Sequence, residues 1–262
     1  MKIYEKYEGF VFDLDGTVYL EDELIDGAKE TINFLIEENK PILFVSNKTT
    51  GNVDDYYNFL LSKGLKIKRE MLITATEVVA EYLAEHFIDK PFFAIAEEKF
   101  IKKLINSGLR YSQEPTEINV VIVTLDRTLT FEKLEIAKKA IEKGAHFFAA
   151  NIDNTCPVKT GEITDAGSTI ASLEKSTRKK LELHFGKPSK FMIDKIKSKL
   201  PLPISNYLLT GDRLETDIKM ANDAGMDSAL VQTGVTKIYN GITAKPTYAI
   251  KNIAEIISEK IK

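Results

Sequence analysis

Residues 9–20, GFVFDLDGTVYL, place two acidic residues, Asp13 and Asp15, directly after an apolar run. The apolar run is typical of a buried strand, and charge at the end of a buried strand is costly unless it is paired or binds a cation. The two acids therefore either form a turn that ends the strand or take part in chemistry. The residues that follow the other strands of the chain decide between these readings.

Apolar runs alternate with helical patterns along most of the chain, which predicts βαβ units and a mainly parallel sheet. The predicted strands cover residues 10–15, 41–47, 92–96, 119–125, 145–151, 181–186, 206–212 and 227–234. The predicted helices between them include residues 27–39, 52–64, 76–87, 98–108, 131–144 and 166–177. The fold class is therefore α/β, with a Rossmann-like core.

Polar residues follow the ends of four of these strands. They are Asp13 and Asp15, Ser46 and Asn47, Lys187, and Asp212 with Asp217. The carboxyl ends of parallel strands lie at one edge of a sheet, where open α/β sheets bind their ligands. We therefore expect several carboxylates, a lysine and a hydroxyl to meet in one cleft.

The residue types in this cleft favour phosphate chemistry with a hard cation. Clustered carboxylates repel one another unless a cation lies among them, and oxygen ligands favour Mg²⁺ over zinc. A single cysteine, Cys156, excludes an internal disulfide and a cysteine metal cluster. A lysine and a turn that leads into a helix suit a phosphate group. One aspartate can then attack phosphorus, and a second can transfer protons.

In this order, the four segments resemble the four motifs of the haloacid dehalogenase-like (HAD) hydrolase superfamily. They are DLDGT (13–17), SN (46–47), GKP (186–188) and GDRLETD (211–217). The resemblance implies that Asp13 is the nucleophile and a metal ligand. It implies that Asp15 is the general acid/base and offers its backbone carbonyl to the metal, with Thr17 orienting Asp15.

The resemblance also implies roles for the later motifs. Ser46 and the backbone of Asn47 would bind phosphate oxygens, and Lys187 would neutralise charge on the nucleophile and the phosphoryl group. Asp212 would bind Mg²⁺, and Asp217 would support the water molecules around the metal.

The spacing of the motifs predicts two domains. The interval between the first two motifs has room for one crossover helix, whereas the interval between Ser46 and Lys187 has room for a whole α/β domain. We expect a discontinuous catalytic core at residues 1–89 and 181–262 and an inserted domain at residues 90–180. This placement, with residues 124–134 and 149–177, resembles the type-2 cap of the NagD-like, 4-nitrophenylphosphatase-like subgroup.

Three further side chains in or near these segments have predicted roles outside the four motifs. In the predicted cap, Asn151 and Asp153 are candidates for binding the leaving group of the substrate. The subgroup often has two asparagines after the hydroxyl of the second motif, but here Asn47 is followed by Lys48. Lys48 either projects into solvent or adds positive charge at the mouth of the cleft.

Composition limits the other possibilities. The net charge of -3 argues against nucleic acid as a partner. No apolar run approaches the ~20 residues of a membrane helix, and the first residues lack a secretory pattern. We therefore expect a cytoplasmic monomer or homodimer that does not bind membranes.

The predicted activity is that of a Mg²⁺-dependent phosphatase of small phosphate monoesters, which forms an aspartyl-phosphate. Expected substrates are 4-nitrophenyl phosphate and nucleotide or sugar phosphates. The alternatives are a phosphotransferase or phosphomutase on the same scaffold, and a regulator that binds a phosphorylated ligand.

Overall fold

The larger sheet of the computed structural model, which describes residues 1–236 and 244–258, has six parallel strands in these ranges. Their order across the sheet is β14-β13-β12-β1-β4-β5. The strands are β1 (Gly9–Asp13), β4 (Ile42–Ser46), β5 (Leu72–Thr74), β12 (Tyr207–Gly211), β13 (Asp227–Val231) and β14 (Tyr248–Ile250). The predicted α/β fold with a parallel sheet is confirmed.

Successive side chains of the larger sheet point to opposite faces, and both faces are covered by helices. Val11 and Val45 belong to a hydrophobic cluster that includes residues of α4 (Ala75–His86), α8 (Lys190–Lys199) and α9 (Lys219–Ala224). Phe10, Phe12 and Phe44 belong to a second cluster. That cluster includes residues of α1 (Ile3–Lys6), α2 (Ala28–Glu37), α3 (Val53–Ser62) and α10 (Glu255–Ser258).

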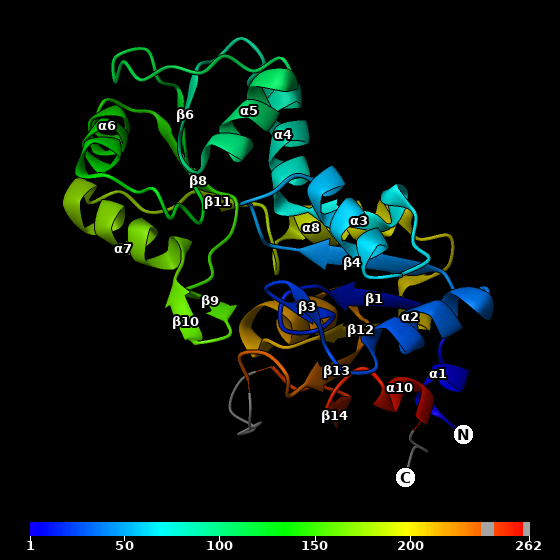
Figure 1. Cartoon of the computed structure of the whole chain (residues 1–262). Helices are drawn as coiled ribbons and strands as arrows, with labels where there is room; N and C mark the ends of the chain where they lie inside the picture. Colours follow the sequence, from blue (N-terminus) through cyan, green and yellow to red (C-terminus); the bar gives the residue numbers. More distant parts are fainter. Residues whose placement is uncertain (237–243, 259–262) are drawn as a thin grey trace.

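A smaller parallel sheet forms the core of the upper lobe in Figure 1, whereas both termini lie in the lower lobe. One face of this sheet packs with α5 (Glu98–Asn106), and the other packs with α6 (Phe131–Glu142) and α7 (Ala166–Thr177). The strands have the order β11-β8-β7-β6 and comprise β6 (Phe92–Ile95), β7 (Val120–Val123), β8 (His146–Ala149) and β11 (Leu183–His184).

The pairing of β11 bears on the predicted domain boundary. Leu183 and His184 lie within the predicted core segment, yet they pair with Phe148 and Ala149 of the smaller sheet. We therefore propose that the chain returns to the core after His184, and the division into core and cap stays a proposal.

The described residues also form two short antiparallel hairpins, which the sequence did not predict. They are β2 (Tyr19–Leu20) with β3 (Glu23–Leu24), and β9 (Thr155–Val158) with β10 (Gly161–Thr164). The β9–β10 hairpin extends from the upper lobe toward the lower one in Figure 1. Lys159, in its turn, forms an ion pair with Asp22 in the turn of the other hairpin at 2.6 Å.

None of the helices within residues 1–236 and 244–258 combines the length and the apolar character that crossing a membrane would require.

Candidate active site

The order of the strands brings three of the predicted motifs together. β1 lies between β4 and β12, and all three strands run in the same direction. Asp13 ends β1, Ser46 ends β4, and Asp212 directly follows β12. The central position of β1 therefore places the predicted nucleophile between the other two motifs.

Lys187 lies among the buried carboxylates. Its Nζ donates to Asp217 Oδ1 at 2.6 Å and forms an ion pair with Asp13 Oδ1 at 2.5 Å. The side chains of all three residues are buried. One carboxylate oxygen each from Asp13, Asp212 and Asp217 lies within 4.8 Å of the others, so a third acid lies beside the two that Lys187 contacts.

This arrangement favours binding of a further positive charge. Burial, reinforced by the charges of Asp217 and Asp212, raises the pKa of Asp13 well above its usual range, although Lys187 opposes the shift. Burial and the charge of Asp217 raise the pKa of Asp212 to about 7. Burial alone would lower the pKa of Lys187, but the charges of Asp13 and Asp217 raise it. The lysine stays charged and does not balance the carboxylates alone.

Local backbone geometry supports the first motif. Gly16 has φ +87°, and a Cβ at this position would lie 2.6 Å from Asp212 Oδ2, so a side chain here would collide with the acidic cluster. Thr17 Oγ1 donates to Asp13 Oδ2 at 3.0 Å. Thr17 was expected to orient Asp15, but the turn places its hydroxyl on Asp13.

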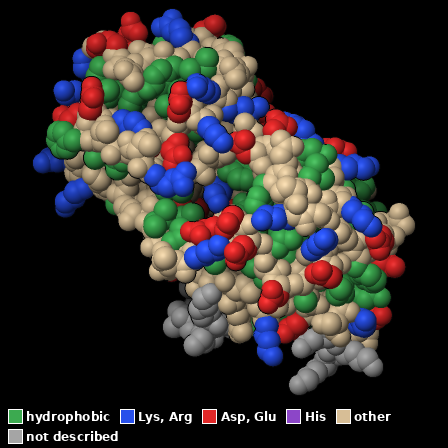
Figure 2. Space-filling view, in the orientation of Figure 1, with side chains coloured by type: hydrophobic (Ala, Val, Ile, Leu, Met, Phe, Trp, Pro, Cys, Tyr) green, Lys and Arg blue, Asp and Glu red, His purple; other side chains and the backbone are tan. Residues whose placement is uncertain are grey.

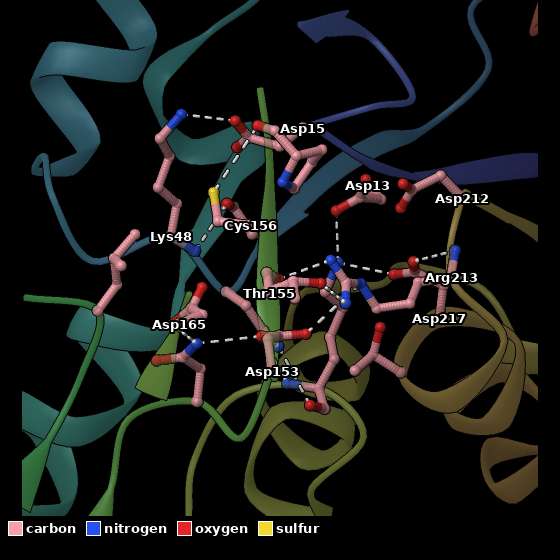
Figure 3. Close-up of a pocket in the computed structure, with 17 residues that line it drawn as sticks. Asp13, Asp15, Lys48, Asp153, Thr155, Cys156, Asp165, Asp212, Arg213 and Asp217 are labelled. Atoms are coloured by element: carbon pink, nitrogen blue, oxygen red, sulfur yellow. Dashed lines mark hydrogen bonds and ion pairs between the residues drawn. The ribbon is translucent and has the colours of Figure 1, made fainter. Parts of the chain in front are cut away.

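The carboxylate of Asp15 points away from the acidic cluster, toward Lys48 (Figure 3). Lys48 Nζ lies 2.5 Å from Asp15 Oδ1, and the hydroxyl of Tyr19 donates to Asp15 Oδ2 at 3.0 Å. Lys48 therefore lies at the cleft, as one of the two alternatives predicted, and does not project into solvent. Tyr19 packs in the core and also contacts the site.

The second motif connects the two lobes. Ser46 Oγ accepts a hydrogen bond from the backbone N of Lys48 at 3.1 Å. Asn47 Nδ2 donates to Asp153 Oδ2 at 2.8 Å, and Asn47 Oδ1 accepts from the backbone N of Lys187 at 2.6 Å. The Asn47 side chain thus links the loop that carries Lys187 to the predicted cap loop.

The predicted cap residues lie at the same cleft. Asn151 Nδ2 donates to Asp153 Oδ2 at 3.1 Å and to Asp165 Oδ1 at 2.9 Å. Burial raises the pKa of Asp165 to about 6. Asn151 and Asp153 are therefore brought to the cleft as expected, although their binding to a leaving group stays a prediction.

Arg213 and Cys156 were not singled out from the sequence as part of the site. Arg213 Nη2 donates to the backbone O of Thr155 at 2.8 Å, and Arg213 Nε lies 3.7 Å from Asp153 Oδ1. The position of Arg213 directly after Asp212 was the available signal. Cys156 also lines the cleft, but burial raises its pKa to about 12, so its thiol stays protonated and is a poor nucleophile.

A cavity of about 50 Å³ lies where these side chains converge. In Figure 2, acidic and basic side chains gather on the surface between the two lobes. The cavity lining contains all the predicted site residues except Thr17: Asp13, Asp15, Ser46, Asn47, Asn151, Asp153, Lys187, Asp212 and Asp217. The space has room for only a few water molecules.

The donor set fits a hard divalent cation. The acidic cluster of Asp13, Asp212 and Asp217 offers only carboxylate oxygens, the ligands that Mg²⁺ prefers. Burial, with repulsion from neighbouring acids, raises the pKa values of Asp13 and Asp212, and a bound cation would favour their ionised forms. The Asp15 carboxylate lies outside this cluster.

Comparison with known proteins gives consistent matches over the whole chain. A family model described as haloacid dehalogenase-like hydrolase matches residues 10–110, and a second, HAD-hydrolase-like, matches residues 184–256. The sugar-phosphatase AraL of Bacillus subtilis is 32% identical, covering 95% of this chain and 91% of the relative. The 5'-nucleotidase YutF of the same organism is 32% identical, covering 96% of this chain and 98% of the relative.

A solved structure gives the same result for the fold. The 4-nitrophenylphosphatase from Thermotoga maritima superposes with a TM-score of 0.90 at 33% sequence identity, covering 99% of both chains.

Proposed function

The chain belongs to the haloacid dehalogenase-like hydrolases and is a phosphoric monoester hydrolase, and from this premise we propose that it hydrolyses small phosphate monoesters through an aspartyl-phosphate on Asp13. The single observation that carries the proposal is the position of the Asp13 carboxylate. It lies in the cleft beside Lys187, with a second acid, Asp15, two residues away.

In the first half-reaction, an Asp13 carboxylate oxygen attacks phosphorus and the bond from phosphorus to the leaving oxygen breaks. Lys187 offsets negative charge on the nucleophile and on the phosphoryl oxygens. Ser46 and the backbone of Asn47 lie in the cleft lining, where they bind phosphoryl oxygens. Asp15 supplies a proton to the leaving oxygen when that oxygen is a poor leaving group.

In the second half-reaction, water attacks phosphorus of the aspartyl-phosphate, and Asp15 accepts a proton from that water. The products are inorganic phosphate and the regenerated carboxylate of Asp13. The cap loop with Asn151 and Asp153 covers the cleft during this cycle and limits access of bulk water.

We propose that Asp13 and Asp212, with the backbone carbonyl of Asp15, hold Mg²⁺, and that Asp217 supports the site through its contacts with Lys187 and Arg213 N. Bound Mg²⁺ neutralises the charge that develops on phosphoryl oxygens. The buried oxygen-only donor set supports this choice of metal.

The substrate is proposed as a small phosphorylated metabolite, with 4-nitrophenyl phosphate as a synthetic one. The relatives are named as a sugar-phosphatase, a 5'-nucleotidase and a 4-nitrophenylphosphatase, so sugar phosphates and nucleotides both stay candidates. The phosphatase names favour hydrolysis over the mutase and regulator alternatives. The cytoplasmic location and the oligomeric state stay predictions.

Replacing the nucleophile tests the proposal. Asp13→Asn keeps the shape of the side chain but removes the attacking carboxylate, so we expect turnover of 4-nitrophenyl phosphate to fall by roughly 10³-fold or more. Asp194→Asn, an exposed acid on α8, is the matched control and should keep wild-type activity. Near-normal phosphate release by Asp13→Asn would refute the aspartyl-phosphate mechanism.

A further inference from the structure

Both carboxylate oxygens of Asp15 are held by donors from two different segments. Lys48 Nζ contacts Oδ1 at 2.5 Å, and the Tyr19 hydroxyl donates to Oδ2 at 3.0 Å. We propose that Lys48 is a positioning residue which, together with Tyr19, orients the Asp15 carboxylate for attack of water on the aspartyl-phosphate. The inference rests on the proposed function and adds a role that the four motifs do not assign.

The two lysines of the cleft serve different acids. Lys187 contacts Asp13 and Asp217 and is buried with them. Among the described residues, Asp15 is the only acid with which Lys48 forms an ion pair. The cationic group of Lys187 is thus engaged by the acidic cluster, which leaves Lys48 as the cation that holds Asp15.

The Lys48–Asp15 pair is more shielded than the ion pairs on the surface of the protein. Its side chains are 23% and 13% exposed, compared with 84% and 53% for Lys190 and Asp194. Shielded pairs are screened less by solvent and salt than exposed ones. The hydrogen bond from Lys48 N to Ser46 Oγ also fixes the start of this side chain at the end of β4.

Tyr19 is fixed in turn by its surroundings. Its side chain is buried, and its ring packs edge-on against Phe59 at 5.0 Å between centroids. Lys48 Nζ lies 5.4 Å from the centroid of the Tyr19 ring, within the range of a cation–π contact. Tyr19 and Lys48 therefore contact each other as well as Asp15, and the three side chains form one unit.

The two contacts leave acceptor sites on Asp15, which lines the same cavity as Asp13, for a proton from water. An ionised carboxylate offers about four lone-pair sites, of which the two contacts use two. When water attacks, its oxygen bonds to phosphorus and one proton moves to a remaining site on Asp15. The bond between phosphorus and the Asp13 oxygen breaks, and its electron pair stays on the Asp13 carboxylate. A misplaced acceptor slows this step, because proton transfer requires hydrogen-bond distance.

The first half-reaction with 4-nitrophenyl phosphate does not need this unit. 4-Nitrophenolate is a stable anion and leaves without a proton. Loss of the positioning contact should therefore slow hydrolysis of the aspartyl-phosphate and leave its formation unchanged. In steady state, kcat and KM then fall together, and kcat/KM is preserved.

The experiment compares Lys48→Met with wild type in stopped flow and in steady state, using 4-nitrophenyl phosphate and saturating Mg²⁺. We expect a burst of 4-nitrophenol with an unchanged rate constant, followed by a steady-state rate about 100-fold lower. Lys48→Arg, which keeps a cationic donor, should recover much of kcat. Lys190→Met is the control for loss of an exposed lysine.

Tyr19→Phe keeps the ring and removes only the hydroxyl, so it tests the same unit without loss of charge. It should also lower kcat at constant kcat/KM, and its effect should not add to that of Lys48→Met. This variant decides the question if Lys48→Met does not fold, as judged by thermal unfolding.

An unchanged kcat in both variants would overturn the inference. Equal losses in kcat and kcat/KM without a burst would also overturn it, because the lysine would then act before the aspartyl-phosphate forms. These results differ from failure of the proposed function, in which wild type itself would form no phosphorylated enzyme.

Discussion

Asp165 shows how the cleft places an acid where its charge is disfavoured. It caps the start of α7, accepts hydrogen bonds from Asn151 Nδ2 and Ala166 N, and lies close to Asp153. Burial is the largest cause of its raised pKa, and the charge of Asp153 adds to the shift. The folded protein therefore binds the Asp165 proton more tightly than the unfolded chain does.

The sign of this shift predicts how Asp165→Asn affects stability. The pKa rises from 3.8 to about 6, so ionised Asp165 destabilises the fold progressively as pH rises through this window, and fully above it. The penalty at neutral pH is about 3 kcal/mol. Asparagine keeps the capping oxygen and carries no charge. We expect Asp165→Asn to gain stability over wild type at pH 7.5 and little at pH 4, as measured by urea unfolding. The same gain at both pH values would contradict the assignment.

At this scale, the sequence predicted which acids meet but not how each side chain turns. Asp13 ends β1 and Asp212 follows β12 in one parallel sheet, so their convergence follows from topology, and Asp217 lies in the helical turn that comes next. The contact of Thr17 with Asp13 depends on the geometry of one tight turn. The contact of Lys48 with Asp15 depends on a long, flexible side chain, whose direction no pattern of residues specifies.

Among elements, the β9–β10 hairpin contributes Thr155, Cys156 and Pro157 to the lining of the cleft. Arg213, which directly follows Asp212, donates to the backbone O of Thr155 in this hairpin. Lys159 forms ion pairs with Asp22 and Glu23 at 2.6 and 3.2 Å, but these acids are exposed. Exposed pairs contribute little, so the partly buried contact of Arg213 should dominate.

Arg213→Met therefore should release the hairpin. Loss of a hydrogen bond to a charged group costs about 1.5–3 kcal/mol, which raises local opening by roughly 10- to 100-fold. We expect amide hydrogen exchange in residues 155–164 to accelerate by this factor, while the strands of the larger sheet keep their rates. Lys159→Met is the comparison and should have a much smaller effect. Equal acceleration in both variants would argue against Arg213 as the main contact.

The elements missed from the sequence were the short ones. The strands predicted at residues 41–47 and 119–125 contain β4 and β7, because long apolar runs mark buried parallel strands. β2 and β3 have two residues each, too few to show an alternating pattern, and β9 contains Pro157. These hairpins exist because residues far apart in the sequence pack against them, which no local pattern records.

Across the whole molecule, one hydrophobic cluster joins the two sheets. It includes Val11 and Val45 from the larger sheet and Phe92 and Phe148 from the smaller one, with α4 between them. The buried acidic cluster lies at the carboxyl edge of the larger sheet. Charge repulsion within the acidic cluster opposes the stability that the hydrophobic cluster provides.

Binding of Mg²⁺ should relieve this repulsion and stabilise the folded protein. A ligand at 100 times its Kd contributes about 2.7 kcal/mol, which corresponds to a rise in Tm of roughly 5–10 °C for a chain of this size.

Asp212→Asn removes one acid of the cluster and keeps an acceptor for Val235 N, which now donates to Asp212 Oδ2 at 2.6 Å. We expect this variant to melt higher than wild type without Mg²⁺ and to lose most of the response to the ion. Differential scanning fluorimetry with MgCl₂, and with KCl at equal ionic strength, separates binding from screening. An equal Mg²⁺ shift in wild type and Asp212→Asn would place the ion elsewhere, because a cation held by Asp212 must respond to its loss.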